Sequence, residues 1–200
     1  DGAGGTDTVS YAFATAGVAV SLATAGTQAT GGSGSDTLIS IENLIGGGFN
    51  DSLIGNAGNN VLDGGAGNDT VSYVSATAGV TLSLATAGAQ ATGGSGSDTL
   101  TSIENLLGSA YADRLTGNTG ANSLAGGAGN DTLDGGAGSD TLAGGDGSDI
   151  YYVRDGGDVV SETNATTSTG GTDTAYSYLS AYTLTANVEN ARILSTTVAN

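Results

Sequence analysis

Aspartate recurs at nine-residue intervals inside a glycine-rich motif, and this spacing is the strongest chemical signal in the sequence. Residues 64–72 show the pattern Gly-Gly-x-Gly-x-Asp-x-U-x, in which U is apolar, and three copies follow one another over 126–152. Carboxylates and backbone carbonyls are oxygen donors, and Ca²⁺ accepts six to eight oxygens at flexible angles. Mg²⁺ needs tighter geometry, and zinc sites typically use His or Cys, which the chain lacks.

The candidate metal ligands are the aspartates at the sixth position of the motif, called the slot below, and the glycines at the first and fourth positions of the best copies. The aspartates are Asp36, Asp51, Asp69, Asp98, Asp113, Asp131, Asp140, Asp149 and Asp158. The glycines are Gly64, Gly67, Gly126, Gly129, Gly135, Gly138, Gly144 and Gly147. The alternative is a set of solvated acidic turns, because Asp favours turns in any case. The regular glycine frame favours metal binding.

Neighbouring turns are expected to share an ion. The predicted pairs are Asp51–Asp69, Asp113–Asp131, Asp131–Asp149 and Asp140–Asp158. Asn60 and Asn122 replace Asp at two slots, which removes one charge from each. Asp36 and Asp98 lie outside the tandem copies, so their stacking partners stay open.

The motif also predicts the elements that position these residues. Three residues around the apolar slot form a short strand with one inward side chain, and six glycine-rich residues turn the chain. The glycine density excludes helix. Two motifs then make one coil of an all-β, right-handed parallel β-roll, a β-solenoid with turns stacked at each edge.

A longer repeat overlies the short one. Residues 11–72 align with residues 73–134 at an offset of 62 without a gap, and a shortened third copy begins near Gly171. We therefore expect a roll over 1–162, ending in the nonamers 135–162. Residues 163–200 are expected to form a linker, around the low-complexity stretch 163–170, and a truncated third repeat or cap.

The segments 18–22 and 80–84 alternate in polarity and predict half-buried strands longer than those of the motif, which widen the coil or add a hairpin. Glutamates in the Ile/Val-Glu-Asn elements are interpreted as polar turns that cap a strand, with cation binding as the open alternative. They are Glu42, Glu104 and Glu189.

Three groups of side chains are assigned structural roles. Acidic residues outside the slot are expected to be solvated: Asp63, Asp134, Asp146 and Asp155. The arginines are expected to offset nearby carboxylates: Arg114, Arg154 and Arg192. C-terminal tyrosines are expected to cap the roll, with a sugar-binding face as the alternative: Tyr151, Tyr152, Tyr176, Tyr178 and Tyr182.

Composition excludes several functions. Twenty acidic and three basic residues give a formal charge of −17, so nucleic acid is not an expected partner. No apolar run is long enough to span a bilayer, and no N-terminal signal peptide is expected in this segment. Without His or Cys there is no triad or thiol nucleophile, and carboxylates held by Ca²⁺ lack the raised pKa of an acid catalyst. We expect a non-enzymatic module.

The motif resembles the RTX (repeats-in-toxin) calcium-binding nonapeptide family. The copies that carry the resemblance are 64–72, 126–134, 135–143 and 144–152. The resemblance implies a β-roll with several Ca²⁺ ions between its turns, in a secreted bacterial protein that is exported by a type I system and folds on extracellular Ca²⁺.

Three roles suit such a module. The first is a structural repeat of an extracellular or cell-surface protein, such as a surface layer, adhesin or filament, with neighbouring repeats or self-association as partners. The alternative is a C-terminal accessory or secretion domain of a type I-secreted protease, lipase or polysaccharide-modifying enzyme. Ice binding is disfavoured, because the third motif position does not repeat one residue type.

Overall fold

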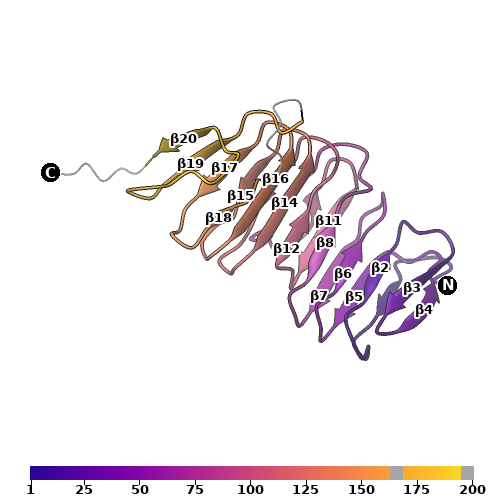
Figure 1. Cartoon of the computed structure of the whole chain (residues 1–200). Helices are drawn as coiled ribbons and strands as arrows, with labels where there is room; N and C mark the ends of the chain where they lie inside the picture. Colours follow the sequence, from indigo (N-terminus) through magenta and orange to yellow (C-terminus); the bar gives the residue numbers. More distant parts are fainter. Residues whose placement is uncertain (163–168, 195–200) are drawn as a thin grey trace.

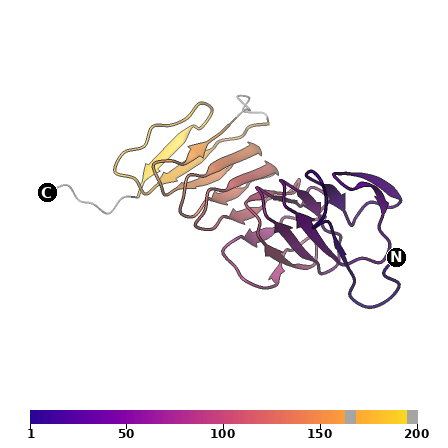
Figure 2. The same ribbon diagram turned by 90° about the horizontal axis from the view of Figure 1, so that it is seen from below.

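The computed structural model describes residues 1–162 and 169–194. The described residues form strands joined by turns, without a helix. The strands stack into an elongated body, with the N-terminus at one end and the strand at 190–193 at the other (Figures 1 and 2). The expected linker falls largely on 163–168, which lies outside the described residues.

Three long sheets run along the body, and almost every pairing in them is parallel. The first sheet contains, in spatial order, β1 (Thr8–Ser10), β5 (Asn43–Gly47), β7 (Val61–Gly65), β11 (Ser97–Thr101) and the antiparallel β10 (Gln90–Ala91). The second contains β18 (Val159–Val160), β16 (Thr141–Asp146), β14 (Ser123–Ala128), β12 (Asn105–Leu107), β8 (Thr70–Ser72), β6 (Ser52–Ile54) and β2 (Ala19–Ser21). The third contains β20 (Asn190–Ile193), β19 (Thr174–Ser177), β17 (Ile150–Val153), β15 (Thr132–Asp134), β13 (Arg114–Thr116) and β9 (Thr81–Ser83). The all-β, parallel β-roll is therefore confirmed.

The nonapeptide run forms coils of two motifs each, as the spacing predicts. In the third sheet Leu115 pairs with Leu133 and Leu133 with Tyr151, so equivalent residues lie 18 positions apart. In the second sheet Leu124 pairs with Leu142 in the same way. Each of these side chains is fully buried.

These inward side chains form the core of the roll. Most strands of the three long sheets contribute an apolar residue to a ladder. Burying a Leu side chain stabilises the fold by about 1.5–3 kcal/mol. No strand buries enough surface alone, because its apolar residue is covered only by the coils on either side. Stability is therefore cooperative along the stack.

Longer coils interrupt the regular run in each 62-residue unit. The first unit contains a separate antiparallel hairpin of β3 (Thr27–Gly31) and β4 (Gly34–Thr37). The second unit pairs β10 with β11 in the same antiparallel manner, and β11 also pairs with β7. These excursions explain why the ninefold count fails between 73 and 97.

The prediction of longer strands at 18–22 and 80–84 is wrong. β2 and β9 contain three residues each and are no longer than the motif strands, which contain three to six. Val20 and Leu82 point into the core, and they pair with Leu53 and Leu115 of the next coil. These segments therefore replace a nonamer strand in the parallel sheets, and the added hairpins follow them.

The C-terminal strands continue the roll. β19 pairs in parallel with β17, and β20 pairs in parallel with β19. Ala175 takes the inward position above Tyr151. The segment 169–194 therefore adds two further strands to the third sheet, and the proposed boundary at 162/163 stays a prediction.

Candidate calcium sites

The acidic slot of each coil lies directly before a strand, so parallel stacking lines the slots up in columns. The first column contains Asp7, Glu42, Asn60 and Asp98. The second contains Asp51, Asp69, Glu104, Asn122, Asp140 and Asp158. The third contains Asp113, Asp131, Asp149, Asp173 and Glu189.

The structure brings each of the four predicted pairs together in neighbouring turns. The Oδ1 atom of Asp69 accepts a hydrogen bond from the backbone N–H of Asp51 at 2.7 Å. The same contact joins Asp113 N–H to Asp131 at 2.8 Å, Asp131 N–H to Asp149 at 2.7 Å, and Asp140 N–H to Asp158 at 3.2 Å. One carboxylate oxygen of each later turn thus holds the turn before it.

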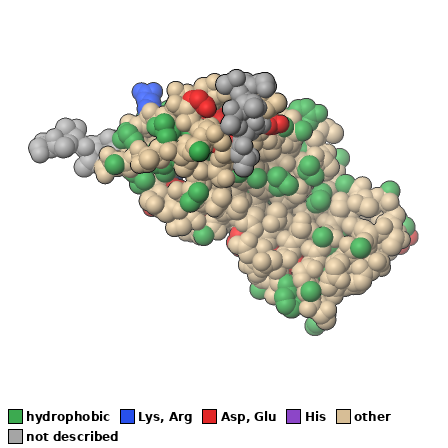
Figure 3. All heavy atoms as spheres, in the orientation of Figure 1, with side chains coloured by type: hydrophobic (Ala, Val, Ile, Leu, Met, Phe, Trp, Pro, Cys, Tyr) green, Lys and Arg blue, Asp and Glu red, His purple; other side chains and the backbone are tan. Residues whose placement is uncertain are grey.

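The second carboxylate oxygen has no protein partner in several slots. The Oδ2 atoms of Asp69, Asp131, Asp140 and Asp149 are buried and accept no hydrogen bond. Buried polar atoms are normally satisfied, and an unpaired buried charge is expensive. A cation between the turns would supply the missing interaction. Few carboxylates reach the face shown in Figure 3, although the chain has 20 acidic residues.

The first glycine of each motif leaves room for the Oδ2 atom of the slot aspartate. A Cβ on Gly126 would lie 2.1 Å from Asp131 Oδ2, and one on Gly135 would lie 2.2 Å from Asp140 Oδ2. Such contacts are sterically forbidden. A carbonyl oxygen of the next turn reaches the same space at Gly108, where a Cβ would lie 2.4 Å from Gly126 O.

The glycine at the fourth motif position is required by the backbone conformation. Gly129 and Gly147 have φ values of 124° and 128°, which side-chain-bearing residues rarely adopt. A Cβ on Gly147 would also collide with the Gly129 carbonyl of the turn before it. The motif therefore brings carbonyl and carboxylate oxygens together between turns, with glycine wherever a side chain would separate them.

Burial raises the pKa values of the stacked carboxyls. The pKa of Asp131 rises to about 7, mainly because of burial, with a further increase from Asp149 and Asp113 and a decrease from the Asp113 N–H. The pKa of Asp149 rises to about 6 for the same main reason, with a further increase from Asp173. Burial also raises the pKa values of Asp69, Asp98 and Asp140. A bound divalent cation would instead lower the pKa values of these carboxyls, because it favours the ionised form.

The donor set consists of few carboxylates and many carbonyls. Within 1–162 and 169–194, no group of three or more His, Cys, Asp or Glu side chains forms a metal cluster. A cation between two turns would therefore need backbone oxygens as further ligands, which Ca²⁺ accepts readily.

Comparison with known protein families agrees with this geometry. The profile of the RTX calcium-binding nonapeptide repeat (4 copies) matches residues 41–72, 107–142 and 129–160. The chain contains RTX calcium-binding nonapeptide repeats. RTX repeats bind Ca²⁺, and no catalytic domain is identified in the chain. A search of curated proteins finds no match.

Of the two predicted ligands outside the tandem copies, Asp98 lies in the first column and Asp36 lies in none of the three columns. Asp98 is fully buried, and its oxygens accept hydrogen bonds from Asn60 N–H at 2.9 Å and Tyr73 Oη at 3.0 Å. Asp36 lies on β4, half-buried, and accepts a hydrogen bond from Thr30 Oγ1 at 2.9 Å. The structure does not bring Asp36 together with another predicted ligand.

The glutamates of the Ile/Val-Glu-Asn elements occupy the aspartate slot of the RTX columns. The Oε2 atoms of Glu42, Glu104 and Glu189 each accept the N–H of the preceding Asp, in Asp7, Asp69 and Asp173, at 2.8 Å. These contacts join each glutamate to the start of the strand in the neighbouring coil. The interpretation as caps and the alternative as metal ligands both stay predictions. The signal in the sequence for this placement in the slot is that Glu-Asn-Leu fills the same three motif positions as Asp-Thr-Val.

Sequence reasoning did not select Asp7 and Asp173 as ligands. Asp173 is buried in the third column, and its Oδ1 accepts the N–H of Asp149 at 2.8 Å. Asp7 begins the first column and has a buried Oδ2 without a partner. The likeness of residues 171–174 to residues 5–8 was the available signal.

The prediction that Asp134 is solvated is wrong. Asp134 is buried beside Arg154, whose Nε and Nη2 atoms lie 2.7 Å and 2.5 Å from its two carboxylate oxygens. The ion pair raises the pKa of Arg154. This confirms the expectation that Arg154 offsets a carboxylate. Asp146 and Asp155 are exposed, and Asp63 is half-buried.

The C-terminal tyrosines divide between the core and an outer face. Tyr151 is fully buried in the ladder of inward residues. Tyr152 and Tyr176 stack with ring centroids 5.6 Å apart, and the Arg154 guanidinium lies 4.8 Å from the Tyr178 ring centroid. The rings therefore support one another across β17 and β19.

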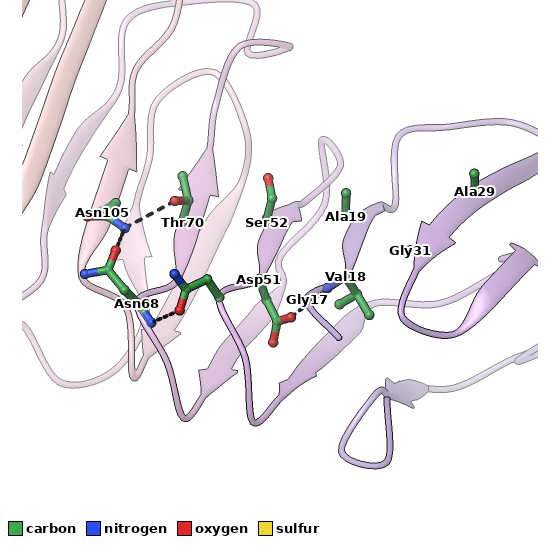
Figure 4. Close-up of a pocket in the computed structure, with 11 residues that line it drawn as sticks. Gly17, Val18, Ala19, Ala29, Gly31, Asp51, Ser52, Asn68, Thr70 and Asn105 are labelled. Atoms are coloured by element: carbon green, nitrogen blue, oxygen red, sulfur yellow. Dashed lines mark hydrogen bonds between the residues drawn. The ribbon is translucent and has the colours of Figure 1, made fainter. Parts of the chain in front are cut away.

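A groove beside the first hairpin has no catalytic geometry. It is bordered by Ala29 and Gly31 of β3 and by the outer residues of β2, β6 and β8 (Figure 4). Asp51 is the acidic residue among the described residues that line it, and its carboxylate is held by the N–H groups of Val18 at 2.8 Å and Gly47 at 2.5 Å. No helix in the described ranges is long and apolar enough to cross a membrane.

Proposed function

We propose that the chain is a structural module of a secreted or cell-surface bacterial protein, and that it folds and becomes rigid on binding extracellular Ca²⁺. The observation that supports this most is the row of buried, unpartnered Oδ2 atoms in the columns. The metal-free roll must bury these carboxylates against one another. Ca²⁺ between turns would remove that cost, so its binding free energy becomes folding free energy.

The proposed ligands are the slot aspartates of the three columns with the carbonyl oxygens of the glycine turns. Inside a cell, with little free Ca²⁺, the chain at −17 would remain expanded through self-repulsion. Outside, it would fold coil by coil. Two like units stacked end to end favour an array role, as in a surface layer, adhesin or filament, over an accessory role beside an enzyme.

Circular dichroism of the full chain during a Ca²⁺ titration tests the proposal, with Mg²⁺ at the same ionic strength as the control. We expect the β signal to appear cooperatively with Ca²⁺ and not with Mg²⁺. A chain that is equally folded in excess chelator would contradict it. A midpoint in the millimolar range would support an extracellular site, and a midpoint far below micromolar would contradict one.

A further inference from the structure

Glu162 stands where the RTX pattern places a glycine. β16 and β18 pair with Thr141 beside Val159 and Leu142 beside Val160, so Glu162 lies one coil above Gly144. In the nonapeptides that begin at residues 108, 117, 126, 135 and 144 this first position is Gly, which leaves room for the oxygen of the slot Asp or Asn. Glu162 is nevertheless buried, with 8% of its surface exposed.

The Glu162 carboxylate is only half satisfied. Its Oε1 atom accepts the N–H of Gly144 at 3.1 Å and a hydrogen bond from the Tyr151 hydroxyl. Its Oε2 atom is buried and has no partner. A buried carboxylate that is held on one oxygen and left bare on the other is costly unless something else binds it.

A second bare oxygen lies against the same glycine. A Cβ on Gly144 would lie 2.0 Å from both Asp149 Oδ2 and Tyr151 Oη. Asp149 has 1% of its surface exposed, and its Oδ2 atom is buried without a hydrogen bond. Three oxygen-bearing side chains thus converge on Gly144.

No positive charge among the contacts of this cluster offsets the two carboxylates. Arg154 is engaged by Asp134. Burial, with smaller contributions from Asp173 and Asp149, raises the pKa of Glu162 to about 7. The arrangement therefore needs either protons or a cation.

We infer that Glu162 and Asp149 together bind a divalent, oxygen-preferring cation, Ca²⁺, at the last coil of the roll. Glu162 would supply a side-chain ligand that the nonapeptide pattern lacks, and the family match ends at residue 160. The inference rests on the proposed calcium-dependent folding. Tyr151 orients the carboxylate by donating to Oε1, which leaves Oε2 for the metal.

The variant Glu162→Gln in the full chain tests this inference. Gln keeps an oxygen for Gly144 N–H and Tyr151 Oη but removes the charge. Asp63→Asn is the matched control, since it also removes one charge, at a half-buried site outside the slot. The number of bound Ca²⁺ ions and the melting temperatures in Ca²⁺ and in chelator are measured at pH about 8, above the raised pKa values.

We expect Glu162→Gln to bind one ion fewer and to show a smaller Ca²⁺-induced rise in melting temperature. In chelator it should melt no lower than the wild type, because a buried charge has been removed. Asp63→Asn should match the wild type in both measurements. Glu162→Asp, which keeps the charge with a shorter reach, should bind more weakly than the wild type.

An unchanged number of bound ions and an unchanged Ca²⁺-induced rise in melting temperature in Glu162→Gln would overturn the inference. Glu162 would then be a buried, protonated carboxyl without a metal. If Glu162→Gln fails to fold, unweakened Ca²⁺ binding in Glu162→Asp would overturn it instead. A wild-type chain without any Ca²⁺-induced rise would refute the proposed function itself, so the two failures are distinguishable.

Discussion

The two 62-residue units share most of their sequence, yet they hold equivalent aspartates differently. In the second unit, β11 joins the first sheet beside β7, Leu100 pairs with Leu62, and Asp98 is fully buried. In the first unit, β4 pairs only with β3, and Asp36 and Leu38 are half-buried. The difference lies in the contacts: Asp98 accepts the N–H of Asn60 from the coil beside it, whereas Asp36 accepts a hydrogen bond from Thr30 of its own hairpin.

The comparison shows that the local motif does not by itself create a buried carboxylate. The Gly-Gly-Ser-Gly-Ser-Asp sequence is the same at 31–36 and 93–98. Burial comes from the coil on the other side, which supplies an N–H for the carboxylate and an apolar side chain for the ladder. The electrostatic environment of a carboxylate in the acidic slot of a solenoid therefore depends on the coils stacked against it.

The largest test of this principle is Asp131→Ala, because it removes a buried carboxylate from the middle of a column. The Asp131 carboxylate accepts the N–H of Asp113, and this contact is lost, whereas the backbone N–H of residue 131 can still donate to Asp149. We expect a loss of about 2–4 kcal/mol in Ca²⁺ and a higher Ca²⁺ midpoint, measured by thermal unfolding and titration. Asp146→Ala, at an exposed position outside the slot, is the control. Equal midpoints for the two variants would reject the ligand assignment.

The paired variants Asp98→Asn and Asp36→Asn test the two units directly. Asp98→Asn should destabilise the Ca²⁺-bound chain by about 1–3 kcal/mol, because a buried acceptor of Asn60 N–H and Tyr73 Oη changes. Asp36→Asn should change stability by less than about 0.5 kcal/mol, since its site is half-buried. Both are measured by thermal unfolding in Ca²⁺. A larger effect at Asp36 would show that stacking does not control these sites.

The smallest expected effect is the pH dependence of the metal-free chain. Asp131 and Asp149 have folded-state pKa values of about 7 and about 6, above the ordinary value of about 3.9. Each group therefore favours folding when protonated, and this contribution is lost as pH rises from about 4 to about 7. In chelator, acidification from pH about 8 to about 5 should increase the β signal.

In Ca²⁺ the dependence should reverse, because protons compete with the metal for the same oxygens. Asp131→Asn should flatten the profile in chelator, because it removes a carboxyl whose pKa is raised. Circular dichroism across this pH range, with and without chelator, measures both. A wild-type chain that loses β signal on acidification in chelator would contradict the prediction.

The sequence predicted those parts of the molecule that repeat. The nine-residue spacing was sufficient to predict the slot, the inward residue and the 18-residue coil, because each depends on local geometry and stacking. The β-roll and the stacking of Asp131 against Asp149 were predicted from the nine-residue spacing. The assignment of these residues as Ca²⁺ ligands stays a prediction.

Features at the insertions could not be counted from the motif. Glu104 occupies a slot because a short turn begins at Ser102, whose φ is 51°, and the Ser102 carbonyl takes the place of a motif glycine carbonyl above Gly64. This replacement is visible only once the coils are stacked. The Asp134–Arg154 pair and the burial of Glu162 likewise depend on residues one coil apart in space.

The direction of the slot hydrogen bonds has a consequence for the whole solenoid. In each contact the later coil provides the carboxylate and the earlier coil provides the amide, as for Asp131 with Asp113. Each coil therefore presents carboxylate acceptors toward the earlier coil and amide donors toward the later coil. Only a head-to-tail order of the coils preserves this bonding, so the solenoid has a fixed polarity.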